Sequence, residues 1–315
     1  MLKKKKFLFP AFFGLLLCAA VLIFGLSKLK AYGQNGDESA VQNITQIDKF
    51  ERPRAAIVRK TISNAPAVSA LATAENIRLK DSAVWAFGGK GQRGWYLYIS
   101  LIQETIETDA DAATIEFARA VAAWQNTSGI APTGIIDEDT LYQMIKDWQA
   151  RRLNSSRTPA PERLFDAPIS DFYDPTRGAD LLKVERETYD AYKRMVAAAA
   201  KELKLKTTSS GELAPGESFL KIVSSYRSRE HQARLRAASP NSGRAGLAVN
   251  SPHFTGNALD IYVGGEPVST IDANRAVQVQ TPAYKWLVKN ASRFGFYPYY
   301  YEPWHWEYVP RNLAK

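Results

Sequence analysis

The hydrophobic pattern of the chain begins with one uninterrupted apolar run. From Phe7 to Leu26 every residue is apolar or small, and four lysines, Lys3 to Lys6, stand directly before it. A helix of that length rises about 30 Å, the thickness of a bilayer's hydrocarbon core. Lysines ahead of such a run favour the cytoplasmic side. We therefore expect a cytoplasmic tail at 1–6, a single transmembrane helix at 7–26, and the rest of the chain outside the cytoplasm.

A cleaved signal peptide is the alternative interpretation of the apolar run. The small-x-small site that a signal peptidase needs is missing where the run ends at Leu26, which favours an uncleaved anchor. The residues that follow, 27–84, are polar, mixed in character and without a sustained hydrophobic period. This pattern predicts a linker between the anchor and the folded domains.

Apolar residues recur with helical spacing between residues 85 and 150. The pattern predicts three helices, at Trp95–Ile106, Asp111–Gln125 and Asp137–Gln149. Asp111 and Asp137 are the expected N-caps, and Gly129, Pro132 and Gly134 supply the turn between the last two helices. We expect a compact all-α three-helix domain.

The remainder of the chain mixes helical and strand-like patterns. Residues 151–163 are rich in helix breakers and predict a second linker. From residue 164 to 315 the pattern predicts helices and strands in alternation, with helices at 183–203, 229–238 and 281–294, strands at 219–225 and 258–263, and a final aromatic hairpin. Such a mixture predicts an α+β domain, a small antiparallel sheet with flanking helices.

Composition narrows the classes of function. The formal net charge is +9, but the basic residues are scattered and are not interleaved with aromatic ones, so we expect no nucleic-acid partner. The only cysteine, Cys18, lies in the apolar run. An intrachain disulfide and a cysteine-liganded metal site outside the membrane are therefore excluded.

Two of the three histidines have carboxylates nearby in the sequence. His253 is followed by Asp260 across a turn that contains Gly256, and Glu302 stands three positions before His305. Two imidazoles and one carboxylate suit catalytic Zn²⁺, which takes three protein ligands and leaves the fourth position to water. A further carboxylate can then accept a proton from that water. The pattern predicts a catalytic zinc site.

The spacing alone leaves the identity of the base open. If 304–309 is a strand, His305 and Glu307 point to the same face. Glu307 is then either a rival of Glu302 for the role of base or a partner that orients His305. The tyrosine-rich segment 297–301 would line a substrate cleft or pack on the sheet.

Arg227 is the candidate for stabilising negative charge in the reaction. It lies at the end of a predicted strand, and its planar guanidinium suits an oxyanion or a substrate carboxylate. The adjacent Arg229 competes with it for this role. His231, on the helix that follows, is expected to serve packing or to face solvent.

Three short motifs carry a resemblance to a known family. They are Ser-x-Tyr-Arg-Ser at 224–228, Ser-x-His-x-x-Gly-x-Ala-x-Asp at 251–260 and Glu-x-Trp-His at 302–305. Together, and in this order, they resemble the zinc D-alanyl-D-alanine carboxypeptidases, a family that includes the vancomycin-resistance D,D-peptidases and some phage L-alanyl-D-glutamate endopeptidases. The usual Gly before Tyr-Arg is Ser225 here, a departure that touches strand geometry rather than the chemistry.

The resemblance implies a role for six residues of these motifs. The Zn²⁺ ligands that it implies are His253, Asp260 and His305. The resemblance also implies that Glu302, in preference to Glu307, is the general base. Arg227 would stabilise the charge that develops on the scissile carbonyl, and Ser251 would contact the substrate backbone.

The helical segment carries a second resemblance. The stretch Phe117–Gln125, followed by Gly129-Ile130, the residues 133–137 and Thr140-Leu141, is similar to the peptidoglycan-binding domain of many cell-wall hydrolases. Trp124 replaces the Phe that usually precedes the Gln. The resemblance implies that residues 85–150 bind peptidoglycan; the alternative is a helical bundle that serves only as a spacer.

Taken together, the patterns and resemblances predict a bacterial cell-envelope enzyme, held in the cytoplasmic membrane by one helix, with 164–315 as its catalytic domain. Its substrate would be the peptidoglycan stem peptide, and a D,D-carboxypeptidase is the leading hypothesis. An endopeptidase or an L,D-carboxypeptidase would use the same chemistry. A catalytically silent wall-binding protein is the alternative from another class, and it would predict loss of a ligand or base, all of which are present.

Overall fold

The computed structural model describes residues 65–238 and 248–310 of the chain. The predicted tail at 1–6, the predicted transmembrane helix at 7–26 and most of the predicted linker at 27–84 lie outside the described residues. Among the helices that are described, none combines the length and the apolar character needed to cross a membrane. All described residues belong to one unit, Lys60–Lys315.

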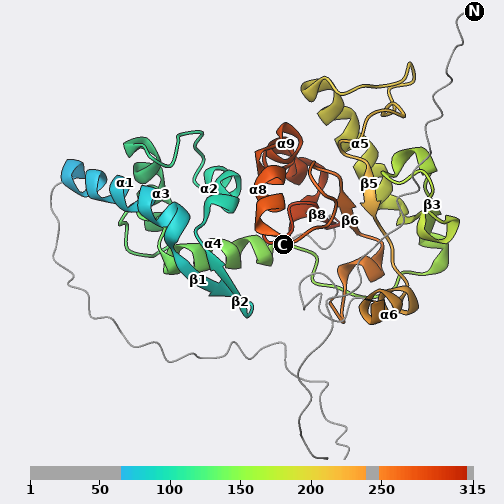
Figure 1. Cartoon of the computed structure of the whole chain (residues 1–315), viewed down its shortest axis with the longest axis horizontal. Helices are drawn as coiled ribbons and strands as arrows, with labels where there is room; N and C mark the ends of the chain where they lie inside the picture. Colours follow the sequence, from blue (N-terminus) through green and yellow to red (C-terminus); the bar gives the residue numbers. More distant parts are fainter. Residues whose placement is uncertain (1–64, 239–247, 311–315) are drawn as a thin grey trace, which may run out of the picture. The chain divides into compact units, whose positions relative to one another are not determined.

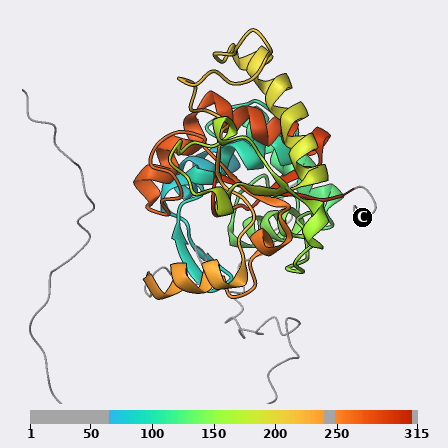
Figure 2. The same ribbon diagram turned by 90° about the vertical axis from the view of Figure 1, so that its right-hand side faces the viewer.

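The first part of the described chain is mainly helical (Figure 1). Its helices are α1 (Ala65–Ser82), α2 (Ile99–Thr105), α3 (Ile115–Thr127) and α4 (Glu138–Ala150), with a 3-10 turn η1 (Tyr96–Tyr98) before α2. The hairpin of β1 (Val84–Phe87) and β2 (Lys90–Arg93), teal in Figure 2, joins α1 to η1. The three predicted helices are present, but the hairpin and α1 show that the expectation of an all-α three-helix domain was wrong. We call residues 65–150 the helical module.

Helix α1 and the hairpin differ from the sequence-based expectation. The expected linker at 27–84 includes Ala65–Ser82, which form a helix that packs on α3. The apolar stripe of α1 is weak, because exposed Leu71 and Ile77 alternate with buried Ala72. A helix without a clear apolar face gives no periodic hydrophobic signal in the sequence. The predicted linker therefore extends too far toward the C-terminus, because it includes α1.

The helix N-caps explain where α3 and α4 begin. Asp137 caps α4 as predicted, since its side chain accepts a hydrogen bond from the backbone N–H of Thr140 at 2.9 Å. Asp111 does not cap α3; its carboxylate accepts from the N–H of Ala113, two residues on. Thr114 is the cap instead, so α3 starts four residues later than predicted.

A buried glutamine holds the turn between α3 and α4. The side-chain amide of Gln125 donates to the carbonyl of Ile135 and the hydroxyl of Thr140, and it accepts from the N–H of Gly134 at 2.8 Å. Gly134 has φ +74°, and a Cβ there would lie 2.7 Å from the carbonyl oxygen of Ala118. The predicted turn therefore depends on a glycine and on one satisfied polar side chain.

The second part of the chain is the expected α+β domain. A small ribbon of β3 (Leu164–Asp166) and β4 (Lys183–Glu185) precedes the long helix α5 (Arg186–Leu203). The main sheet is antiparallel, in the order β5 (Ile222–Ser224), β6 (Ala258–Ile261), β8 (His305–Tyr308) and β7 (Phe296–Pro298). A mixed α+β architecture with a small antiparallel sheet is confirmed.

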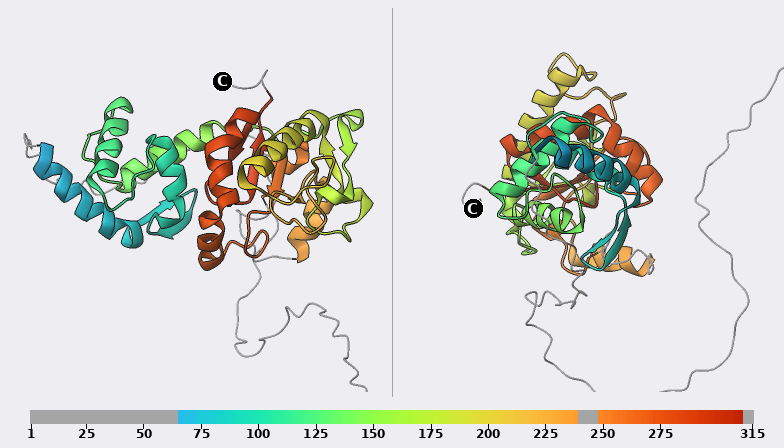
Figure 3. Two further views of the ribbon diagram at one scale, coloured as in Figure 1. Left: turned by 90° about the horizontal axis from the view of Figure 1, so that it is seen from above. Right: turned by 90° about the vertical axis from the view of Figure 1, so that its left-hand side faces the viewer.

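Helices flank this sheet and complete its core. They are α5, α6 (Arg229–Ala238), α8 (Asp272–Gln280) and α9 (Pro282–Asn290), and a 3-10 turn, η6 (Ala291–Phe294), follows α9. In Figure 3, α5 (yellow) and α9 (red) lie side by side, and the two helices are in contact. Helix α8 was not predicted, because its residues between Ile271 and Thr281 carry few large apolar side chains.

The helical module packs against the sheet domain through a buried arginine. Arg275 of α8 is fully buried, and its guanidinium donates to the hydroxyl of Tyr98 at 2.7 Å and to Asp272 at 2.9 Å. Tyr98 also lies against Tyr300, with ring centroids 5.8 Å apart. One core cluster therefore includes side chains of both parts.

Candidate metal and catalytic site

The register of the main sheet brings two of the predicted site residues together. Asp260 on β6 pairs with His305 on β8 and, on the other side, with Ser224 on β5. Side chains directly opposite each other on neighbouring antiparallel strands lie on one face of the sheet. The side chains of Asp260 and His305 consequently meet, with 3.0 Å between Oδ1 and Nδ1.

His253 reaches the same point from the turn η5 (Pro252–Thr255), which precedes β6. The turn ends at Gly256, with φ +73°, and a Cβ there would lie about 3 Å from the backbone of Glu185 on β4. The predicted glycine turn therefore returns the chain toward the sheet in a space that leaves no room for a side chain.

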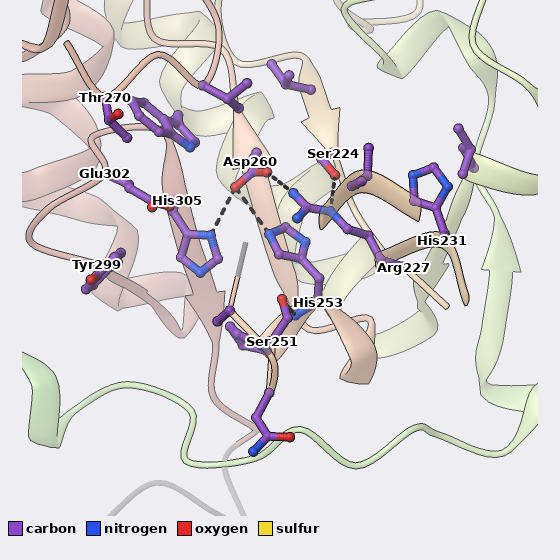
Figure 4. Close-up of a pocket in the computed structure, with 18 of the residues that line it drawn as sticks. Ser224, Arg227, His231, Ser251, His253, Asp260, Thr270, Tyr299, Glu302 and His305 are labelled. Atoms are coloured by element: carbon purple, nitrogen blue, oxygen red, sulfur yellow. Dashed lines mark hydrogen bonds and ion pairs between the residues drawn. The ribbon is translucent and has the colours of Figure 1, made fainter. Parts of the chain in front are cut away.

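The three predicted ligands converge on a small volume. Asp260 lies between the two imidazoles: His253 Nε2 is 3.3 Å and His305 Nδ1 is 3.0 Å from its Oδ1 (Figure 4). One ligand atom from each residue lies within 4.8 Å of the others, and all three side chains are buried. The three residues that the motifs predicted as ligands thus lie close enough to share one ion.

Hydrogen bonds to the outer ring nitrogens set the orientation of both imidazoles. Nδ1 of His253 donates to the backbone carbonyl of Ser225 at 2.7 Å, which leaves the lone pair of Nε2 facing Asp260. Nε2 of His305 is 3.0 Å from the carboxylate of Glu307. Of the two roles left open for Glu307, the contact fits a partner that orients His305.

Buried charges around Asp260 keep it ionised. Burial disfavours its carboxylate, but His253, His305 and Arg227 hold the pKa of Asp260 well below its ordinary value. Burial, with Arg227 nearby, lowers the pKa of His253 to about 4. Burial acts in the same direction on His305, yet its hydrogen bonds to Asp260 and Glu307 raise its pKa to about 9.

This donor set fits a divalent cation. Nε2 of His253 and Oδ1 of Asp260 are both acceptors, and they face each other at 3.3 Å with no proton to share when His253 is neutral. His253, Asp260 and His305 would hold a metal ion through these atoms, which would satisfy the lone pairs of Nε2 and Oδ1 and take the place of the proton on Nδ1 of His305. Two imidazole nitrogens and a carboxylate oxygen form a ligand set that zinc uses in catalytic sites.

Arg227 lies next to Asp260 and is firmly held. Its Nη2 donates to Asp260 Oδ2 at 2.6 Å, Nε donates to Ser224 and Nη1 to Gln232 on α6. Arg227 therefore fixes the carboxylate oxygen that faces away from His253, and it lines the adjoining cavity. Arg229, its predicted competitor, lies outside this network; its guanidinium stacks on Phe254 and contacts the carbonyl of Ser156.

A cavity of about 650 Å³ opens over the three convergent side chains. The six predicted site residues all line it. Ser251 lies at its wall, where the hydroxyl accepts a hydrogen bond from the N–H of His253 and so also caps the turn η5. His231, expected to serve packing or face solvent, is a wall residue on the far side of Arg227 (Figure 4).

Glu302 is the cavity's buried, unpaired carboxyl group. It lies beside His305 in Figure 4, and its Oε1 has no hydrogen-bond partner among the described residues. Burial raises the pKa of Glu302 to about 7, with the positive charge of His305 opposing and the negative charge of Asp260 adding to the shift. A carboxyl group of this kind can both take up and release a proton near neutral pH.

Of three further cavity residues, Arg177 and Arg152 carried no recognisable sequence signal. Arg177 donates to the carbonyls of Leu181 and Val223 and lies on an irregular loop. Arg152 lies in the segment predicted as a linker. Tyr299 belongs to the tyrosine-rich segment 297–301 and lines the cavity, which is one of the two positions expected for that segment. Tyr300 takes the other position and is buried in the core.

Comparison with known proteins agrees with the motifs. Residues 181–311 match the model of the VanY family, described as D-alanyl-D-alanine carboxypeptidase, which confirms the predicted resemblance for this part of the chain. A solved structure, that of the LdcB LD-carboxypeptidase, is 26% identical over 51% of this chain and 73% of that chain, with a TM-score of 0.35. No curated protein matches the chain.

Proposed function

We propose that residues 164–315 form a zinc-dependent carboxypeptidase that removes the terminal D-alanine from peptidoglycan stem peptides. The observation that carries the proposal is the position of Asp260 between two buried imidazoles, with the unpaired carboxyl group of Glu302 at the same cavity. The family match over residues 181–311 supports the reaction class.

Zn²⁺ held by His253, Asp260 and His305 would polarise the scissile carbonyl and make a water molecule more acidic. Glu302 then takes a proton from the attacking water on its free carboxyl oxygen. The C–N bond breaks, and Glu302 returns the proton to the leaving nitrogen of D-alanine. Burial raises the pKa of Glu302 above its ordinary value, which favours a group that both accepts this proton and returns it.

Arg227 and Ser251 support the reaction from the cavity wall. Arg227 retains N–H groups beyond those that bind Asp260, Ser224 and Gln232, and these face the developing oxyanion in the proposed mechanism. Ser251 would contact the peptide backbone of the substrate. Its hydroxyl already accepts from His253, so its O–H remains available as a donor.

The helical module is proposed to bind peptidoglycan, and the segment 7–26 to anchor the protein in the cytoplasmic membrane of a bacterial cell envelope. The similarity of Phe117–Gln125 and of the turn after it to peptidoglycan-binding domains supports the first role. The apolar run after four lysines supports the second.

Digestion of defined muropeptides tests the proposed cleavage site. Mass spectrometry should show loss of one alanine from a pentapeptide stem and no change in a tetrapeptide stem, with the activity removed by a chelator and restored by Zn²⁺. Cleavage of the tetrapeptide stem would indicate an L,D-carboxypeptidase, and a cut between L-alanine and D-glutamate an endopeptidase. Unchanged substrates with fully loaded protein would contradict the proposal.

A further inference from the structure

The carboxylate of Glu307 is fully buried beside the predicted metal site. Its Oε1 accepts from Nε2 of His305 and from Nη2 of Arg152, and its Oε2 accepts from the backbone N–H of Leu153 at 3.0 Å. Two of the three donors therefore come from the segment directly after α4. No other described residue is recorded as a hydrogen-bond partner of this carboxylate.

Arg152 is itself held in a defined position. Its Nη1 donates to the side chain of Gln149 in the last turn of α4, and its guanidinium lies over the ring of Tyr299, 4.3 Å from the centroid. One fifth of the Arg152 side chain is exposed, and the residue lines the cavity. A planar guanidinium that bonds at one edge and stacks on its face has little rotational freedom.

Arg152 lies outside the part of the chain that matches the peptidase family, residues 181–311, whereas its partner Glu307 lies inside it. Arg152 follows the helical module, and that module is fixed to the sheet domain by the buried Arg275 and its hydrogen bond to Tyr98. The position of Arg152 relative to Glu307 is therefore set by how the module packs, not by the sheet alone.

We infer that Arg152 is a positioning residue for the metal site: through Glu307 it fixes the ring of His305 with Nδ1 toward Asp260. The inference rests on the proposed function, since it assigns a role toward the proposed metal. Carboxylates that orient a metal-bound imidazole typically change metal affinity by about 10–100-fold when they are altered. Without Arg152, Glu307 keeps the backbone N–H of Leu153 and Nε2 of His305 as donors but loses the positively charged guanidinium.

A purely structural salt bridge is the competing explanation. It would join the helical module to the sheet domain, and its loss would lower the thermal stability without changing the affinity for metal. Measuring Zn²⁺ affinity and the melting temperature of the metal-free protein side by side separates the two explanations.

The test uses the full-length chain and the variants Arg152→Met, Glu307→Gln and their combination. Arg151→Met is the matched control, because Arg151 is adjacent and exposed. Competition with a chromophoric chelator gives the Zn²⁺ dissociation constant. We expect Arg152→Met to weaken it about 10-fold or more, Arg151→Met to leave it unchanged, and the double variant to be no weaker than Glu307→Gln alone.

An unchanged Zn²⁺ affinity in folded Arg152→Met, or fully additive losses in the double variant, would overturn the inference. If Arg152→Met does not fold, the same measurement is made on Arg152→Lys, which retains the charge but lacks the planar guanidinium that stacks on Tyr299 and donates from separate nitrogens to Gln149 and Glu307. Weaker metal binding supports the inference, and unchanged binding overturns it. Absence of Zn²⁺ binding by the unaltered chain would instead contradict the proposed function.

Discussion

Two carboxyl groups in the cavity differ in their charged neighbours and therefore in their pKa values. Asp260 lies among His253, His305 and Arg227, so it remains ionised. Glu302 lies at the same cavity without a hydrogen-bond partner on its Oε1, and its burial raises its pKa to about 7. Two carboxyl groups whose surroundings separate their pKa values are the pattern expected for a metal ligand and a proton carrier.

The first prediction concerns the proton carrier. Glu302→Gln preserves the shape of the side chain but cannot accept a proton, so we expect kcat to fall about 10²–10⁴-fold while Zn²⁺ remains bound in a 1:1 ratio. Steady-state kinetics on a pentapeptide stem and metal analysis of the same sample provide the two measurements. Glu266→Gln, on an exposed loop, is the control. Retained activity in Glu302→Gln would transfer the role of base to another group.

The second prediction concerns pH. The base acts only when it is ionised, so kcat/KM should fall as pH decreases through the pKa of Glu302, which burial raises to about 7. A bound dication adds a nearby positive charge and lowers this value, so the midpoint of the acidic limb is expected at or below about 7. A pH–rate profile measures it. A midpoint above 7, or an identical limb in the residual activity of Glu302→Gln, would contradict the assignment.

Among the secondary-structure elements, the turn η5 determines whether His253 reaches the sheet. Its last residue, Gly256, has a positive φ and lies against the backbone of β4. Gly256→Ala should therefore cost about 1–3 kcal/mol more than Gly211→Ala, a control with φ +82° and open space around its Cα. Urea denaturation measures both. Equal losses would show that the close packing at Gly256 does not constrain the turn.

The elements also show how far the sequence alone reaches. The three site motifs lie at the end of a strand, in a turn and on a strand. The period-two hydrophobic pattern and the turn residues of the sequence predict these three elements. The convergence of Asp260 and His305 was expected only from the motifs, since strand register depends on pairing between distant segments. Helix α1 was missed because it has no clear apolar stripe, and α8 because it carries few large apolar side chains. Tertiary packing, which the local sequence does not show, stabilises both helices.

Considered as a whole, the described chain is one unit in which the helical module and the sheet domain share a core. Arg275 is the buried polar link between them, so Arg275→Met should destabilise the protein by about 2–3 kcal/mol, because Tyr98 loses a charged partner. The exposed Arg293 offers the control Arg293→Met, with an expected change within about 0.5 kcal/mol.

Unfolding followed by two probes measures this coupling. Far-ultraviolet circular dichroism and tryptophan fluorescence should give one coincident transition for the unaltered protein and separated transitions for Arg275→Met. Separate transitions already in the unaltered protein would show that the two parts are not coupled. Nothing local in the sequence near residue 275 or residue 98 indicates this contact, because it joins segments 177 residues apart.

The central claim is that His253, Asp260 and His305 hold one zinc ion in reach of Glu302. Diffraction from crystals grown with Zn²⁺, recorded on both sides of the zinc absorption edge, tests it most directly. We predict one anomalous peak bonded to Nε2 of His253, Nδ1 of His305 and the carboxylate of Asp260, at about 2.0–2.2 Å from each. A protein that shows no peak between these three side chains, with zinc present in the crystal, would contradict the account.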